Sequence, residues 1–150
     1  MLTQALDPRV QMIRDYADAW NRHAVDDMIQ FHTEDTVWTL PAVQMENVGK
    51  AAVYKAFESV FEYWPDVRFT ERRMRYGGDI VAIETYLYQT LKKPLELGNV
   101  VIQPNGKTVR IDLCDILTLE DGKISRKDSY MNLPYQQEIL EGGRRGGLRS

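Results

Sequence analysis

Asp115 is the residue whose surroundings most suggest chemistry. An expected strand from Val109 to Leu119 puts this carboxylate on one face with four aliphatic side chains, Ile111, Leu113, Leu117 and Leu119. Loss of hydration among such neighbours favours a protonated carboxyl, which can act as a general acid, a general base or a neutral hydrogen-bond donor. Alternatively, Asp115 caps a backbone amide, pairs with a lysine such as Lys127, or faces solvent in a register shifted by one residue.

Three other residues could assist or replace this carboxyl. Tyr16 lies near the apolar face of an expected first helix, where a buried hydroxyl needs a polar partner, unless it is a core tyrosine whose hydroxyl reaches the surface. His32, expected at the end of a second helix, is the better placed of two imidazole bases, or a structural histidine at that helix end. Asp112 lies on the opposite strand face and is expected at the sheet surface or in a dimer interface.

The elements that position these residues follow from a change in apolar spacing along the chain. Apolar side chains recur at three- and four-residue steps in the first half and at every second residue later. We expect helices over residues 8–23, 25–32 and 50–63, irregular chain over 42–48, and strands over 36–40, 67–76, 80–91, 108–119 and 123–133. This order predicts an α+β fold in which helices pack on one face of a curved, mixed or antiparallel sheet.

The composition limits the class of protein. A chain with 43% hydrophobic and 27% charged residues is typical of a globular protein, and we expect one domain over residues 1–141 and a flexible Gly- and Arg-rich tail over 142–150. The net charge of −3 gives no basic field for nucleic acid. A single cysteine, Cys114, and the lack of an N-terminal apolar run indicate a cytoplasmic location without membrane contact. Metal-ligand spacing and nucleotide motifs are also missing, so we expect neither metal nor cofactor.

Several motifs resemble a known family. They are YADAWN at residues 16–21, FHTEDTVW at 31–38, NGK at 105–107 and EDGKI at 120–124. Over roughly residues 8 to 133 the sequence resembles the SnoaL-like branch of the NTF2-like superfamily. The resemblance implies a cone-shaped α+β fold, a sheet wrapped around a long helix, a deep pocket and often a homodimer. Members include polyketide cyclases, ketosteroid isomerases, epoxide hydrolases, dehydratases and binding proteins, so the fold alone does not select an activity.

Residue by residue, the resemblance favours an enolate-stabilising site. Tyr16 and Asp115 fall on the two oxyanion-hole donors of the ketosteroid isomerases. Their general base falls on Leu40, and the tyrosines that support their catalytic tyrosine fall on His32 and Phe57, which argues against steroid isomerisation.

Two further comparisons within the family concern the acid/base residue. The catalytic triad of the limonene-type epoxide hydrolases falls on Thr85, Leu87 and Ser129 and is therefore absent. The acid/base aspartate of the SnoaL-type cyclases falls on Asp115 or, in the other alternative, Asp112.

Strand parity and the resemblance together predict a mostly apolar pocket for a small organic ligand. Its expected lining is Trp20, Trp38, Leu40, Phe57, Phe61, Ile83, Thr85, Leu87, Leu113, Leu117, Lys127, Ser129 and Met131. The function expected is a cofactor-independent cyclase or isomerase acting through an enolate, with Asp115 moving the proton, Tyr16 donating to the oxyanion and His32 assisting. A dehydratase would instead need His32 beside Asp115 in the pocket. A non-catalytic binding or dimerising module would have Asp115 paired or exposed.

Overall fold

A computed structural model describes residues 5–97 and 100–132 of the chain; the expected tail over residues 142–150 lies outside them. The helices are α1 (Pro8–Asn21), α2 (Val25–Gln30) and α3 (Lys50–Tyr63), with a 3-10 turn, η1, at Pro41–Val43. The strands are β1 (His32–Leu40), β2 (Met45–Val48), β3 (Arg68–Gly77), β4 (Ile80–Thr90), β5 (Leu95–Leu97), β6 (Val100–Ile102), β7 (Thr108–Glu120) and β8 (Lys123–Met131). Among the described helices, none is long and apolar enough to cross a membrane.

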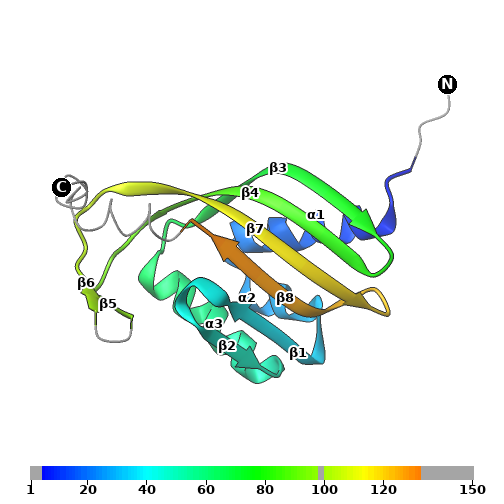
Figure 1. The fold of residues 1–150 in the computed structure, drawn as a ribbon, viewed down its shortest axis with the longest axis horizontal. Coiled ribbons are helices and arrows are strands. Elements are labelled where there is room, and N and C mark those ends of the chain that lie inside the picture. The colour runs from blue at the N-terminus through cyan, green and yellow to red at the C-terminus, as the bar shows by residue number, and fades with distance from the viewer. Residues whose placement is uncertain (1–4, 98–99, 133–150) are drawn as a thin grey trace, which may run out of the picture.

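Six strands form one mixed sheet in the order β2-β1-β8-β7-β4-β3. β1 runs parallel to β8 and every other neighbouring pair is antiparallel. The helices lie on one face of this sheet, with α1 packed on β3 and α3 packed on β1 (Figure 1). The prediction of an α+β fold with helices on one face of a sheet is therefore confirmed.

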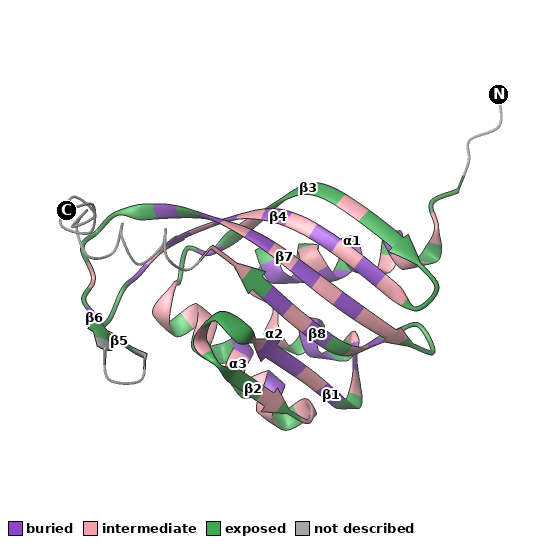
Figure 2. Ribbon diagram, in the orientation of Figure 1, coloured by how far each residue is buried: buried purple, intermediate pink, exposed green. Residues whose placement is uncertain are grey.

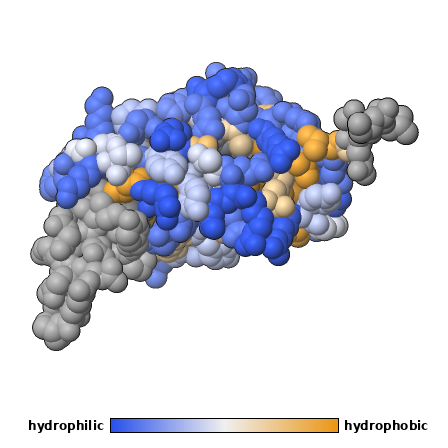
Figure 3. Space-filling model, turned by 90° about the horizontal axis from the view of Figure 1, so that it is seen from above, coloured by the Kyte–Doolittle hydropathy of each residue, from blue (hydrophilic) through white to orange (hydrophobic). Residues whose placement is uncertain are grey.

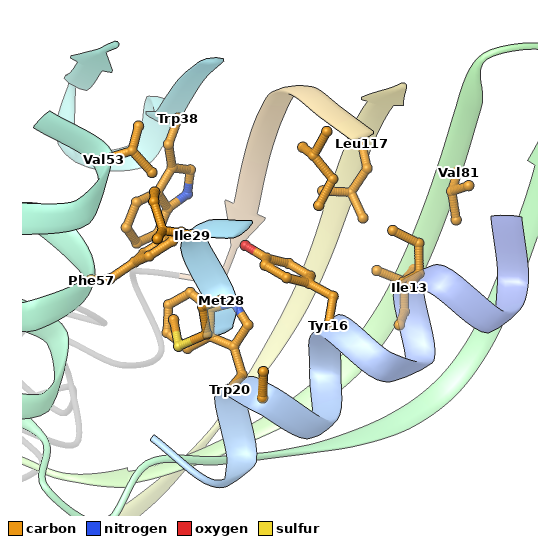
Figure 4. Close-up of a cluster of buried hydrophobic side chains, with 13 residues drawn as sticks. Ile13, Tyr16, Trp20, Met28, Ile29, Trp38, Val53, Phe57, Val81 and Leu117 are labelled. Carbon is orange, nitrogen blue, oxygen red and sulfur yellow. The ribbon is translucent and has the colours of Figure 1, made fainter. Parts of the chain in front are cut away.

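Alternation along β4 and β7 separates the two faces of the sheet. On β4 every second residue from Val81 to Gln89 is buried, and on β7 the buried positions run from Val109 to Leu117, which includes Asp115 (Figure 2). The buried side chains meet α1 and α3, where Tyr16 and Trp20 of α1 face Trp38 of β1 and Phe57 of α3 (Figure 4). The core and the inward polar groups therefore share one layer.

Two expectations about the elements are wrong, and two short strands, β5 and β6, were not predicted. His32 begins β1 instead of ending α2, which stops at Gln30, because β1 pairs with β8 from His32 onward. The segment 42–48 is not irregular, since β2 pairs with the second half of β1. The loop after β4 carries a small two-stranded sheet, β5 with β6. Each of these elements obtains its hydrogen bonds from a partner strand and lacks a periodic pattern of its own.

Candidate functional site

Lys127 lies at the centre of a buried polar cluster. Its side chain points inward from β8, the residue is 3% exposed, and its Nζ lies 3.6 Å from Asp115 Oδ2. The same ammonium lies 4.6 Å from the ring centre of Trp20 and 5.2 Å from those of Tyr16 and Trp38. A desolvated cation over aromatic rings is attracted by their negative faces. One carboxylate and three rings therefore hold the charge of Lys127.

Asp115 is fixed from its other side by a directional chain of hydrogen bonds. The Trp38 Nε1 donates to Ser129 Oγ at 2.9 Å, and Ser129 Oγ donates to Asp115 Oδ1 at 2.5 Å. Because an indole N–H can only donate, Ser129 must accept from Trp38 and pass its own hydrogen toward the carboxylate. Asp115 is thus an acceptor with a lysine partner, which was one of the alternatives left open by the sequence.

A second chain ties Tyr16 to the start of β1. Thr36 donates to the carbonyl oxygen of Ile124 at 3.2 Å, so its oxygen accepts from His32 Nδ1 at 2.8 Å. The other ring nitrogen, Nε2, then accepts from the Tyr16 hydroxyl at 2.9 Å, while Lys127 Nζ donates to that hydroxyl at 3.4 Å. The Tyr16 proton is therefore engaged with His32 and is not directed at a ligand.

Burial sets the charge states of this chain. Burial, with Lys127 and Lys50 as further causes, lowers the pKa of His32 from 6.5 to about 3, so the imidazole is neutral at pH 7. Burial likewise raises the pKa of Tyr16, against an opposing effect of Lys127. For Lys127, burial acts to lower the pKa, but the Asp115 carboxylate and Tyr16 outweigh it and the pKa is raised. The cluster thus keeps one ammonium beside a neutral imidazole and a neutral phenol.

A cavity of about 490 Å³ lies between the sheet and α3. This volume falls in the range of cavities that take small organic ligands. Of the lining expected from the sequence, eight residues bound it: Trp20, Trp38, Leu40, Leu87, Leu113, Lys127, Ser129 and Met131. The cavity is therefore mostly apolar and has Lys127 and Ser129 in one part of its wall.

The remaining expected site residues lie elsewhere. Ile83, Thr85, Leu117, Tyr16 and Asp115 line a second cavity of about 30 Å³, which shares Trp20, Phe69 and Lys127 with the large one. Phe57, Phe61 and His32 belong to neither lining. A ligand in the large cavity therefore meets Lys127 and Ser129, with Asp115 behind them. His32 does not lie beside Asp115 in either cavity, so the condition set for a dehydratase is not met.

Structure also separates the two aspartates of β7 and adds residues that the sequence did not single out. Asp112 lies on the outer face, 3.4 Å from Arg110, while Asp115 faces inward. Gln89, a buried residue of the large cavity, was missed, although its alternation with Leu87 placed it inward. Met45 and Asn47 of β2 were missed because that strand was interpreted as irregular. Within the described residues, no three His, Cys, Asp or Glu side chains gather as metal ligands.

Comparison with known proteins identifies the family. Solved structures with the same fold include AclR, a candidate hydroxylase from Streptomyces galilaeus (TM-score 0.73, 23% identity, 89% of this chain and 84% of that chain). A candidate SnoaL-like polyketide cyclase from Jannaschia sp. CCS1 has a TM-score of 0.80 at 16% identity over 93% of this chain and 99% of its own. TerC, co-crystallised with polyporic acid, has a TM-score of 0.73 at 16% identity over 91% of this chain and 100% of its own.

These identities are low, so the three structures establish the fold alone. The comparison with curated proteins gives no match. The family model described as the SnoaL-like domain matches residues 13–127, which is most of the chain. The protein therefore belongs to the SnoaL-like domain family.

Proposed function

We propose that the large cavity binds a flat, mostly apolar carbonyl compound and stabilises its enolate through Lys127, as part of a cofactor-independent cyclase or isomerase reaction. The observation that carries the proposal is a buried ammonium in the wall of a mostly apolar cavity. When an α-proton leaves such a compound, negative charge develops on the carbonyl oxygen. A preorganised cation in a water-poor site stabilises that charge more strongly than water does.

Asp115 then has a supporting role and a proton-accepting role. As the partner of Lys127 it holds the ammonium in place and keeps it charged. Ser129 connects it to the cavity: the serine oxygen takes the proton that leaves the ligand, and the serine hydrogen passes to Asp115 Oδ1, 2.5 Å away. Tyr16 and His32 fix Lys127 from the opposite side and do not contact the ligand.

Named relatives agree with a small organic ligand. One neighbour is a candidate SnoaL-like polyketide cyclase, and another was crystallised with polyporic acid. A polyketide-like carbonyl compound is therefore the ligand class we propose for this chain. The proposal does not require a metal or a bound cofactor.

The first test is the binding of 2-naphthol, a phenol whose anion mimics an enolate and whose ionisation is followed by absorbance and fluorescence. We expect the wild-type protein to bind the anion preferentially and to lower the phenol pKa. Lys127→Met should weaken binding of the anion by about a hundredfold. Lys55→Met is the matched control, because Lys55 also lines the cavity but is exposed. If Lys127→Met does not fold, Lys127→Met with Asp115→Asn, which removes both charges, takes its place.

A second measurement separates catalysis from binding. We expect the protein to accelerate exchange of the α-protons of 2-tetralone in D₂O, followed by NMR, and Ser129→Ala to slow that exchange while leaving 2-naphthol binding nearly unchanged. Binding without exchange would support the second candidate, a non-catalytic binding module. The observation that favours this candidate is the pairing of Asp115 with Lys127. Equal binding of 2-naphthol by wild type and Lys127→Met would contradict the proposed function.

A further inference from the structure

Gln89 is a buried amide in the wall of the large cavity with no hydrogen-bond partner for its side chain among the described residues. The residue is only 4% exposed, but its side-chain amide is not fully covered by neighbouring atoms. The amide is therefore accessible from the cavity that the residue lines. The other buried polar residues of this lining differ: Lys127 has Asp115 and Tyr16, and Ser129 has Trp38 and Asp115. An amide that carries two donors and one acceptor is thus free to bind a ligand.

Register places Gln89 far along the cavity from Ser129. Ser129 lies opposite Asp115, which lies opposite Ile83 of β4, and Gln89 follows Ile83 by six residues on the same strand face. Six residues of strand span on the order of 20 Å between backbone positions. The lining between these two positions includes Leu87, Leu113 and Met131. The buried polar residues of this mostly apolar lining therefore lie at two separated positions, Lys127 with Ser129 at one and Gln89 at the other.

We propose that Gln89 forms a second polar subsite, which binds a hydroxyl or carbonyl oxygen at the end of an elongated ligand remote from Lys127. The inference rests on the proposed function for the position of the first oxygen at Lys127, and it adds the length and the second oxygen function of the ligand. A buried amide is costly to leave unpaired, so a ligand oxygen that satisfies it gains affinity over one that leaves it unpaired. Gln89 thereby selects for bifunctional ligands.

A matched pair of rigid probes tests the subsite: 2-hydroxyanthraquinone and 2,6-dihydroxyanthraquinone differ only in a hydroxyl at the opposite end. We measure the affinity of wild type, Gln89→Met and Lys127→Met for each probe by absorbance titration. The second hydroxyl should raise affinity for wild type by about tenfold, which is the effect of one buried hydrogen bond. Gln89→Met has a similar shape without the amide and should reduce this ratio to about twofold, the statistical factor of a symmetric probe.

Lys127→Met should weaken the binding of both probes and leave the ratio of their affinities unchanged. This result separates the subsite from the proposed function. If the affinity ratio of the two probes depends on Gln89 but their affinities do not depend on Lys127, the proposed function is contradicted and the subsite is retained. The same ratio in wild type and Gln89→Met would overturn the subsite. If circular dichroism shows that Gln89→Met does not fold, the wild-type ratio decides, and a value of two or less overturns the inference.

Discussion

Lys127 and Asp115 are each costly to bury alone as charged side chains, but as a pair they can be buried in the folded protein. Two charges that leave water lose the free energy of their hydration. Here their mutual attraction, the aromatic rings and the hydroxyls of Ser129 and Tyr16 offset that loss. Removal of one partner leaves the other buried and uncompensated. The charge that we propose for ligand binding therefore depends on a carboxylate that the ligand does not touch.

A double-mutant cycle tests this dependence. We expect Lys127→Met to lower the free energy of unfolding by about 3 kcal/mol or more, because Asp115 is left buried without its cation. Adding Asp115→Asn should restore most of that loss, since the amide keeps its contact with Ser129 and carries no charge. Urea unfolding at pH 7 measures both variants. Losses that simply add would contradict a coupled pair.

His32 gives the stability of the protein a defined dependence on pH. Its pKa is about 3 in the folded protein and 6.5 ordinarily, so between these values the unfolded chain binds a proton that the folded protein does not. Stability therefore rises with pH across that window and is lost as pH falls from 6.5 toward 3. Each pH unit in the window contributes about 1.4 kcal/mol.

Substitution of this histidine should flatten the slope. We expect His32→Asn to be less stable than wild type at pH 7 and to lose less stability between pH 6 and pH 4, measured by urea unfolding at each pH. His23→Gln is the matched control, because it removes the other imidazole of the chain. A His32→Asn variant with the wild-type slope would contradict the assignment.

Strand parity placed Asp115 on the inward face, and parity with the family resemblance placed Lys127 there, but neither could show that the two residues pair. They also could not show which way the Tyr16 hydroxyl points, because that depends on His32 beginning a strand. The direction of the hydrogen-bond chain follows from Thr36 and the carbonyl of Ile124, which lies 88 residues away in the sequence. Sequence reasoning thus identified the members of the cluster other than Thr36, and not their connections.

At the scale of elements, strand length decides which strands can be predicted from the sequence. β4 and β7 run for 11 and 13 residues and carry a readable alternation of buried and less buried positions. β2, β5 and β6 have three or four residues, too few for a period to be read. Their position depends on a partner strand, and β2 closes part of the cavity. For this reason the sequence did not predict the cavity residues of β2, Met45 and Asn47.

The junction between β2 and α3 depends on a glycine. Gly49 adopts φ +91° and ψ 153°, a region that is nearly restricted to glycine, and its amide donates to the carbonyl of Thr36 on β1 at 2.7 Å. We expect Gly49→Ala to cost about 1–3 kcal/mol of unfolding free energy, from backbone strain alone, because a Cβ there meets no atom within 4 Å. Gly77→Ala, equally uncrowded and without a positive φ, is the matched control and should stay within about 0.5 kcal/mol. Chemical denaturation of both variants decides.

At the scale of the whole molecule, the two faces of the sheet have different roles. The inward face holds the core and both cavities, whereas the outer face carries Tyr86 and Tyr88 beneath the guanidinium groups of Arg68, Arg72 and Arg110. Seen from above, the surface is mostly hydrophilic with separate hydrophobic patches (Figure 3). The homodimer expected from the sequence stays a prediction, which sedimentation of the wild-type protein measures directly.

A hollow core makes binding separable from folding, and Ala56 of α3 offers the means. Ala56 lines the large cavity and is only partly buried, so a larger side chain there enters empty space. We expect Ala56→Phe to change the free energy of unfolding by less than about 1 kcal/mol, since the new ring buries apolar surface without displacing packed atoms. Affinity for 2-naphthol should fall at least tenfold because the ring occupies the space of the ligand.

Ala51→Phe provides the control for this last prediction, because Ala51 is exposed on the same helix and lines neither cavity. We expect it to change neither stability nor affinity. If Ala56→Phe binds 2-naphthol as wild type does, the ligand does not use the large cavity, and Lys127 would have to act from the small cavity that it also lines. If Ala56→Phe loses both binding and stability, the cavity is collapsed in solution and the apolar wall is packed core. Loss of binding with retained stability is the result that a preformed ligand pocket requires.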